Sequence, residues 1–191
     1  MDDWREHVWR SVPEGAEPER FAARRAFLLG HIGRGDRVLD LGCGDGAFAV
    51  AIAGAGATVT MADVAREAVR RARARLPEAE AVVLEEGAPL PFAEDAFDVV
   101  WAGETLEHVA DVTGLLAEVR RVLRWGGTLV ATTPWHARLV AGTDRHFDPR
   151  ADHLRFFSAR TLREVVADAG FADVDVRAAG LRGRYLRLAS R

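Results

Sequence analysis

Residues 38–49 read Val-Leu-Asp-Leu-Gly-Cys-Gly-Asp-Gly-Ala-Phe-Ala, a short apolar strand that leads into a turn with three alternating glycines. Gly42, Gly44 and Gly46 lack a Cβ, so the backbone of this turn can take positive φ values and a ligand can approach it closely. The free N–H groups at the start of the following helix favour polar or anionic ligand atoms. The stretch therefore predicts a strand–turn–helix unit that holds a nucleoside-bearing ligand.

The spacing of the glycines separates this turn from the dinucleotide-binding fingerprint. That fingerprint, Gly-x-Gly-x-x-Gly, places its third glycine three residues after the second, whereas Gly46 follows Gly44 by two. Asp40 stands before the turn, and its carboxylate suits an amino group or a sugar hydroxyl better than a pyrophosphate, whose charge it would repel. The pattern thus disfavours a nicotinamide dehydrogenase.

Three stretches resemble the class I S-adenosylmethionine-dependent methyltransferases, including the small-molecule enzymes similar to those of quinone biosynthesis. Leu39-Asp40-Leu41-Gly42-Cys43-Gly44-Asp45-Gly46 looks like the first motif of that family. Residues 97–109 resemble its fourth strand and the segment beyond, and residues 123–130 resemble the run into its fifth strand, with Arg124 and Trp125 in place of the usual Lys and Pro. The resemblance implies S-adenosyl-L-methionine as cofactor and methyl transfer as activity.

Composition limits the other possibilities. A chain of 191 residues with a net charge of -3 corresponds to one domain without the basic excess typical of nucleic-acid or membrane binding. The start of the sequence shows no targeting signal, so we expect a cytoplasmic protein. All 26 basic residues are Arg and the chain lacks Lys, Asn and Gln, which excludes a Walker loop and a Schiff-base mechanism. Cys43 is the single cysteine, so an intramolecular disulfide is excluded.

The order of elements predicts an α/β fold, a single-domain Rossmann-like doubly wound sheet of seven strands. A helix over 17–32 precedes five strands separated by helical connections, and right-handed crossovers place such helices on both faces of a parallel sheet. The predicted strands are 38–41, 58–62, 81–84, 97–101 and 128–132, and the predicted helices between them are 47–53, 66–76 and 112–123. A helix over 158–169 precedes a C-terminal antiparallel hairpin formed by 173–177 and 185–188. We expect one domain over 1–191, with a helical lid in 1–33 and a substrate-side loop in 134–157.

The predicted cofactor site lies at the carboxyl ends of the strands. Asp63 closes the second strand at the distance expected of an acid that binds ribose hydroxyls; the alternative is an N-cap for the helix that begins near Arg66. By resemblance, Glu86 meets the adenine amino group, although Glu replaces the family's Asp and the contact could shift to Glu85 or to the backbone. The complete predicted set is Asp40, Gly42, Cys43, Gly44, Gly46, Asp63, Val64, Glu86, Gly87, Ala88, Gly103 and Glu104.

Two apolar residues have alternative interpretations. The resemblance implies that residues 101–105 face the transferred methyl group, where the ring of Trp101 could contact the sulfonium; the alternative is that Trp101 belongs to the core. Met61, with Ala88, could enclose the adenine or belong to the core.

The catalytic candidates are histidines. Methyl transfer from a sulfonium needs a held nucleophile rather than a fixed triad, and a nearby base helps when the acceptor carries a proton. His136 and His146 belong to a polar loop after the fifth strand that suits an acceptor pocket or is a solvated surface loop. His108 is a third candidate, or a residue of the following helix start. Together with His153, the loop histidines match no metal-ligand spacing, so we predict no metal.

We expect a small-molecule acceptor, no nucleic acid and no membrane, and leave the oligomeric state open. One alternative is an RNA methyltransferase, which would gather basic residues around the mouth of the site. Another is a non-catalytic subunit that binds S-adenosylmethionine without turnover.

Overall fold

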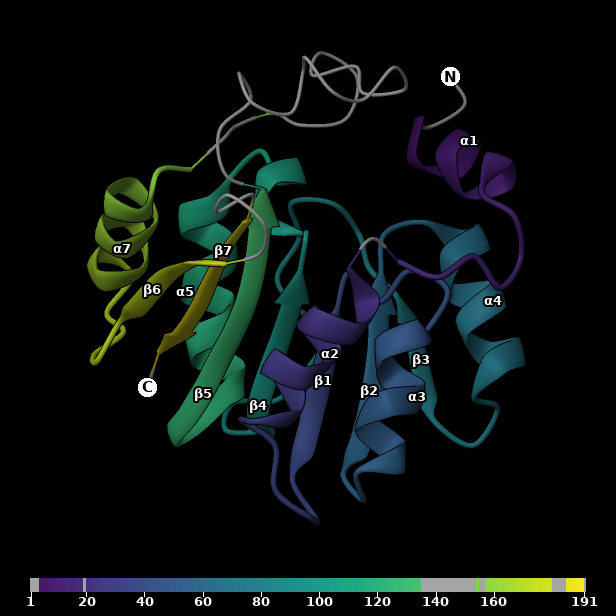
Figure 1. Cartoon of the computed structure of the whole chain (residues 1–191), viewed down its shortest axis with the longest axis horizontal. Coiled ribbons are helices and arrows are strands. Elements are labelled where there is room, and N and C mark those ends of the chain that lie inside the picture. The colour runs from purple at the N-terminus through teal and green to yellow at the C-terminus, as the bar shows by residue number, and fades with distance from the viewer. Residues whose placement is uncertain (1–3, 19, 135–153, 155–156, 180–184, 191) are drawn as a thin grey trace.

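A sheet with the strand order β3-β2-β1-β4-β5-β7-β6 runs through the computed structural model (Figure 1). The structure describes residues 4–18, 20–134, 154, 157–179 and 185–190. The strands are β1 Arg37–Leu41, β2 Thr58–Asp63, β3 Glu80–Val83, β4 Phe97–Gly103, β5 Leu123–Pro134, β6 Asp175–Ala179 and β7 Tyr185–Ser190. The pairs among β1 to β5 are parallel, and β7 pairs antiparallel with both β5 and β6. The predicted α/β fold with a parallel sheet is confirmed. The connection between β6 and β7 lies outside the described residues.

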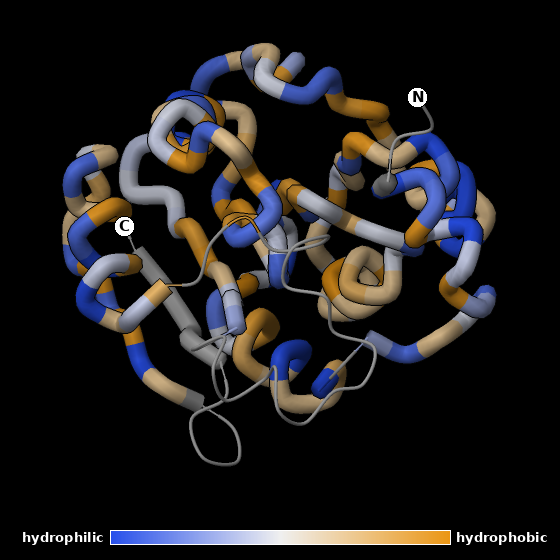
Figure 2. Tube along the Cα trace, turned by 90° about the horizontal axis from the view of Figure 1, so that it is seen from above, coloured by the Kyte–Doolittle hydropathy of each residue, from blue (hydrophilic) through white to orange (hydrophobic). Residues whose placement is uncertain are grey.

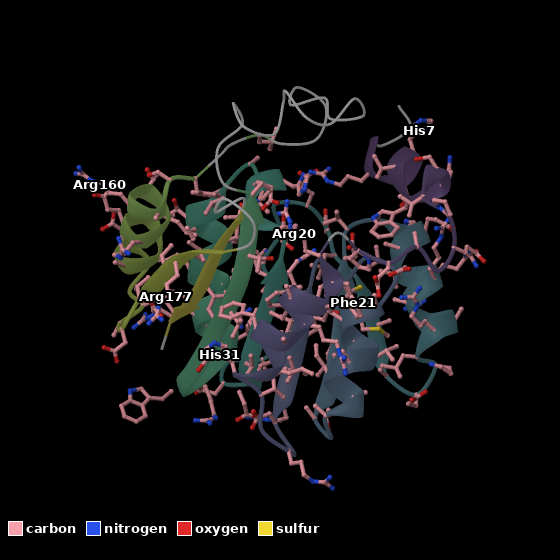
Figure 3. The ribbon with its side chains drawn as sticks, viewed as in Figure 1. His7, Arg20, Phe21, His31, Arg160 and Arg177 are labelled. Carbon is pink, nitrogen blue, oxygen red and sulfur yellow. The ribbon has the colours of Figure 1, made fainter. Side chains whose placement is uncertain are left out.

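Helices cover both faces of the sheet, because successive strand residues point to opposite sides. Val38 of β1 packs in one apolar cluster with α2, α3 and α4, whereas Leu39 packs in the other with α5 and α7. The helices are α1 Trp4–Ser11, α2 Phe21–Leu29, α3 Ala47–Gly54, α4 Arg66–Arg75, the 3₁₀ turn η1 Leu106–His108, α5 Val112–Val122 and α7 Ala159–Asp168. Hydrophobic and hydrophilic residues alternate along them (Figure 2). Charged side chains such as Arg160 of α7 and Arg177 of β6 lie on the outer surface (Figure 3).

Two element boundaries differ from the prediction. The helix expected over 17–32 is shorter, because Arg20 takes a left-handed φ of 53° and the N–H of Phe21 donates to the carbonyl of Pro18 in a turn. The fifth strand begins at Leu123 rather than at residue 128. Phe97 of β4 pairs with Leu123 of β5, and Val99 pairs with Thr128. Because β4 advances two residues between these pairs and β5 advances five, the predicted glycine turn is an irregularity within β5.

The predicted substrate-side loop falls almost entirely on residues 135–153 and 155–156, which lie outside the described residues. In the described part of the chain, every helix is too short or too polar to cross a bilayer.

Candidate functional site

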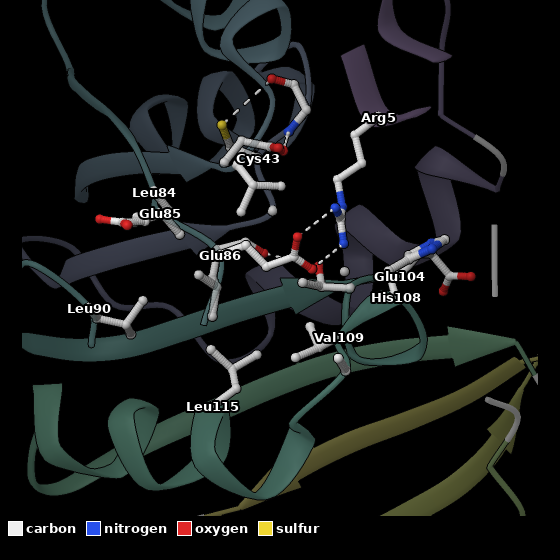
Figure 4. Close-up of a pocket in the computed structure, with 18 of the residues that line it drawn as sticks. Arg5, Cys43, Leu84, Glu85, Glu86, Leu90, Glu104, His108, Val109 and Leu115 are labelled. Atoms are coloured by element: carbon white, nitrogen blue, oxygen red, sulfur yellow. Dashed lines mark hydrogen bonds and ion pairs between the residues drawn. The ribbon is translucent and has the colours of Figure 1, made fainter. Parts of the chain in front are cut away.

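A cavity of about 690 Å³ opens at the carboxyl ends of the parallel strands, where ligands of such sheets bind (Figure 4). Its volume lies within the range of about 300–1,000 Å³ that is usual for small-molecule sites. The glycine turn after β1 forms one wall, the segment 84–90 after β3 forms another, and the end of β4 contributes residues 103–105. Arg5, Val8 and Trp9 of α1 complete the cavity from the N-terminal side.

The glycine turn needs its glycines for two separate reasons. Gly44 has a φ of 55°, and a Cβ there would lie 2.6 Å from the Trp9 ring, so α1 can approach the turn only because this side chain is absent. Gly46 has a φ of 83°, and a Cβ there would lie 3.1 Å from the Cα of Ala72 in α4. The absence of a Cβ thus lets α1 pack against the turn at Gly44 and α4 pack against it at Gly46.

Asp63 closes β2 and lines the cavity, as the sequence predicts for a ribose-binding acid. Its Oδ2 accepts a hydrogen bond from the N–H of Gly44 at 3.0 Å, and its Oδ1 accepts one from Ala65 at 2.9 Å. Burial raises the pKa of this carboxyl, while the backbone donors oppose that shift. The first N–H groups of α4, those of Arg66 and Glu67, donate instead to the carboxylate of Glu6 in α1. Glu6 thus takes the helix-capping role considered for Asp63.

Asp40 and Gly46 are the two predicted cofactor residues that do not line the cavity. Asp40 is 1% exposed, and its Oδ2 has no hydrogen-bond partner among the described residues. Burial, reinforced by the charge of Asp63 and opposed by Arg24, raises the pKa of Asp40 to about 7. The structure therefore places a buried carboxyl with a free acceptor atom behind the glycine turn. The remaining predicted cofactor residues line the cavity: Gly42, Cys43, Gly44, Asp63, Val64, Glu86, Gly87, Ala88, Gly103 and Glu104.

Glu86, predicted to meet the adenine amino group, is exposed and pairs with Arg5 of α1 (Figure 4). The Arg5 guanidinium donates to both carboxylate oxygens, at 2.9 and 2.5 Å, and its charge opposes the rise that burial causes in the pKa of Asp63. One guanidinium thus influences both acids expected to hold the adenosine. Sequence reasoning did not identify Arg5, because nothing local indicates a partner so distant in the chain.

The residues after β4 divide between cavity and core. Gly103, Glu104 and Thr105 line the cavity, as expected from the resemblance. The expectation that Trp101 faces the same point is wrong, because Trp101 is 1% exposed and its ring packs 5.1 Å from that of Phe48. Its other interpretation, a core residue, is the one that the structure bears out. Met61 is likewise fully buried in the core and outside the cavity lining.

Arg24 of α2 is a site residue that the sequence analysis missed. It lines the cavity but is only 5% exposed, and its guanidinium carbon lies 4.8 Å from the Phe48 ring centroid. Its Nε donates to Thr132 Oγ1 at 3.1 Å and lies 4.0 Å from the carboxylate of Glu104. The unusual signal was an arginine on the apolar face of a predicted helix.

Of the three histidine candidates, only His108 belongs to the described residues. His108 lines the cavity at the end of η1. His136 and His146 lie outside the described residues, so their place relative to the cavity stays a prediction.

The chain belongs to a family of methyltransferase domains, since residues 14–176 match the family model described as "Methyltransferase domain". A probable S-adenosylmethionine-dependent methyltransferase of Mycobacterium tuberculosis is 36% identical over 137 residues, which cover 72% of this chain and 49% of that protein. The cofactor of this family, S-adenosyl-L-methionine, is the cofactor that the resemblance predicted. The chain spans about half the length of this relative.

Two further comparisons extend over nearly the whole chain. A trans-aconitate 2-methyltransferase of Paracidovorax citrulli is 31% identical over 192 residues, which cover 99% of this chain and 66% of that protein. The solved structure of a putative methyltransferase of Haloferax volcanii, in complex with the methyltransferase activator Trm112, superposes with a TM-score of 0.78. It is 23% identical and the match covers 100% of this chain and 97% of that chain, so it supports the fold.

Proposed function

We propose that this chain transfers a methyl group from S-adenosyl-L-methionine to an oxygen, nitrogen or carbon atom of a small-molecule acceptor. The observation that carries the proposal is Asp63, a buried carboxylate held by the N–H of Gly44 at the edge of a 690 Å³ cavity. An acid fixed between two strand ends can accept both hydroxyls of a ribose.

The other residues of the cavity fit the same cofactor. Gly42 and Gly44 let the cofactor approach the backbone of the turn, behind which Asp40 is buried, and Glu86 can accept from an adenine amino group once Arg5 shares or leaves it. When bound, the cofactor supplies a methyl group on a sulfonium, which is a good leaving group. The chain's own task is to hold the acceptor in line and to exclude water.

We further propose one domain over 1–191, whose sheet ends in a C-terminal hairpin formed by β6 and β7. In it, residues 1–33 cover the cavity and residues 134–157 provide the acceptor side. The contacts of α1 with α4 and with Glu86 support the first assignment. A small-molecule acceptor is supported by the relative that acts on trans-aconitate and by a cavity that α1 closes over. The side chains of Arg70, Arg71, Arg73 and Arg75 in α4 bind acids or carbonyls of this chain, including Glu67, Glu14 and Asp45, and do not line the cavity. A cytoplasmic location stays a prediction.

The experiment is to incubate the purified chain with S-adenosylmethionine labelled in the methyl group and a bacterial extract, then separate small molecules, RNA and protein. We expect label in the small-molecule fraction, and none with the Asp63→Asn variant. Label in RNA would favour the nucleic-acid alternative, and binding of the cofactor without transfer to any fraction would favour a non-catalytic subunit.

A further inference from the structure

Four ionisable groups lie together at the end of β4, and we call them the β4-end cluster: Arg24, Asp40, Glu104 and Glu107. Arg24 is held by the Thr132 hydroxyl and lies 4.0 Å from Glu104. Burial raises the pKa of both Asp40 and Glu107, and the positive charge of Arg24 opposes that rise in each, so all three carboxyls are within its electrostatic reach. The cluster is mostly buried, since Asp40 and Glu107 are 1% and 0% exposed.

Glu104 is the carboxylate of this cluster that lines the cavity, beside His108 (Figure 4). Its side chain is 29% exposed, whereas that of Arg24 is 6% exposed. Its backbone takes a φ of 58°, a left-handed conformation that is costly for any residue with a side chain. The N–H of Glu104 donates to the carbonyl of Thr132 at 2.8 Å, which holds the strained residue in place. Backbone strain of this kind is concentrated at functional sites, where a side chain must be aimed precisely at a ligand.

The charges of the cluster favour a cation beside Glu104. Burial, and after it the charge of Glu104, raises the pKa of Glu107 well above its ordinary value, and the Thr133 hydroxyl donates a hydrogen bond to Glu107 Oε2. Of these two carboxyls, Glu107 is fully buried, whereas Glu104 lines the cavity and is the one that a cation there would meet. Arg24 by itself would repel a cation placed there, but the carboxylate of Glu104, 4.0 Å from its Nε, offsets that charge.

We propose that Glu104 lies at the point of methyl transfer, where its carboxylate attracts the positive charge of the bound cofactor and accepts the proton that the acceptor loses. This inference rests on the proposed methyltransferase function. The acceptor's oxygen or nitrogen forms a bond to the methyl carbon, and the electron pair of the broken carbon–sulfur bond stays on sulfur. The acceptor's proton passes to Glu104, so a positive charge and a negative charge disappear together.

The inference names a substrate class for the site. A hydroxyl or an amine brings the proton that Glu104 accepts, whereas a carboxylate acceptor brings no proton and carries a charge that Glu104 repels. The acceptor is therefore a hydroxyl- or amine-bearing small molecule. In this respect we expect the chain to differ from its relative that methylates trans-aconitate, a carboxylate.

Binding affinities test the inference without a known acceptor. Three ligands are compared by isothermal titration calorimetry: S-adenosylmethionine, its neutral-sulfur product S-adenosylhomocysteine, and sinefungin, in which an amine-bearing carbon replaces the methyl sulfonium. In the Glu104→Gln variant we expect the affinities for the two cationic ligands to fall about tenfold, the effect of losing one charge-assisted contact. The affinity for S-adenosylhomocysteine should stay within about twofold. Glu164→Gln, which removes the same charge from the exposed face of α7, should change none of the three.

The variants also separate a structural role from a role in charge recognition. Glu104→Gly removes the carboxylate and suits the left-handed backbone, so it replaces the Gln variant if that chain is unstable, and it should show the same selective loss. An equal loss for all three ligands, or no loss for any, would overturn the inference. If the unaltered chain binds none of them, the proposed function itself fails. If it binds all three and the variants do not discriminate, only the role of Glu104 fails.

Discussion

Replacing Gly46 by Ala should destabilise the chain strongly, because the new methyl group would be crowded by its neighbours and the backbone conformation is unfavourable for a residue with a Cβ. Gly46 has a φ of 83°, and its Cβ would lie 3.1 Å from the Cα of Ala72 and 3.4 Å from the Sδ of Met61. Both neighbours are fully buried, and one contact is to backbone, which cannot rotate away. The left-handed conformation costs about 1–2 kcal/mol and overpacking costs about 1–3 kcal/mol, so the free energy of unfolding should fall by about 2–5 kcal/mol.

Gly35→Ala is the matched control for this change. Gly35 has the same φ of 83°, but nothing lies within 4 Å of its Cβ position. It should lose only the conformational part, about 1–2 kcal/mol. Urea unfolding followed by circular dichroism measures both variants, provided that the slopes against urea concentration are unchanged. Equal losses in the two variants would refute the claim that the glycine turn is shaped by close packing of α4 against it.

Three further predictions concern the site. Asp63→Asn should weaken the binding of S-adenosylhomocysteine about tenfold or more in calorimetry, since a charged acceptor for the ribose hydroxyls is lost. An unchanged affinity would show that Asp63 does not bind the cofactor. Arg5→Met should cost less than about 1 kcal/mol of stability, because its partner Glu86 is 54% exposed, yet it should speed hydrogen exchange in α1; unchanged exchange would mean that the pair does not hold α1. In the folded chain the Asp40 carboxyl has a pKa of about 7, whereas in the unfolded chain it releases its proton near pH 3.8. The free energy of unfolding that this carboxyl contributes therefore falls as the pH rises from about 3.8 to about 7. Unfolding of Asp40→Asn measured at pH 5, 6 and 7 should therefore show a flatter dependence than the unaltered chain, and an identical dependence would contradict the raised pKa.

The parallel sheet and the cavity wall formed by the glycine turn and Asp63 were predictable because their signals are local. A strand that ends in alternating glycines and a second strand that ends in Asp63 place both segments at one edge of a parallel sheet, whatever the rest of the chain does. The core position of Trp101 was also within reach, since it alternates with Val100 and shares a face of β4 with Val99.

The contributions of α1 and of Arg24 to the cavity were not predictable, because their contacts join distant segments. Arg5 meets Glu86 across 81 positions, and Arg24 meets Thr132 across 108. A helical pattern places Arg24 on a face of α2, but only the packed sheet decides that this face meets Phe48 and the end of β4. Glu6 caps α4 from another helix, which no capping pattern within α4 indicates.

The most direct test of the central claim is calorimetric titration of the unaltered chain with S-adenosylmethionine, S-adenosylhomocysteine and NAD under identical conditions. We predict saturable binding of the two sulfur cofactors at one site and no binding of NAD, with a matching stabilisation of about 2.7 kcal/mol when the ligand is at 100 times its dissociation constant. Binding of NAD alone, or of none of the three, would contradict the assignment of this cavity to S-adenosylmethionine.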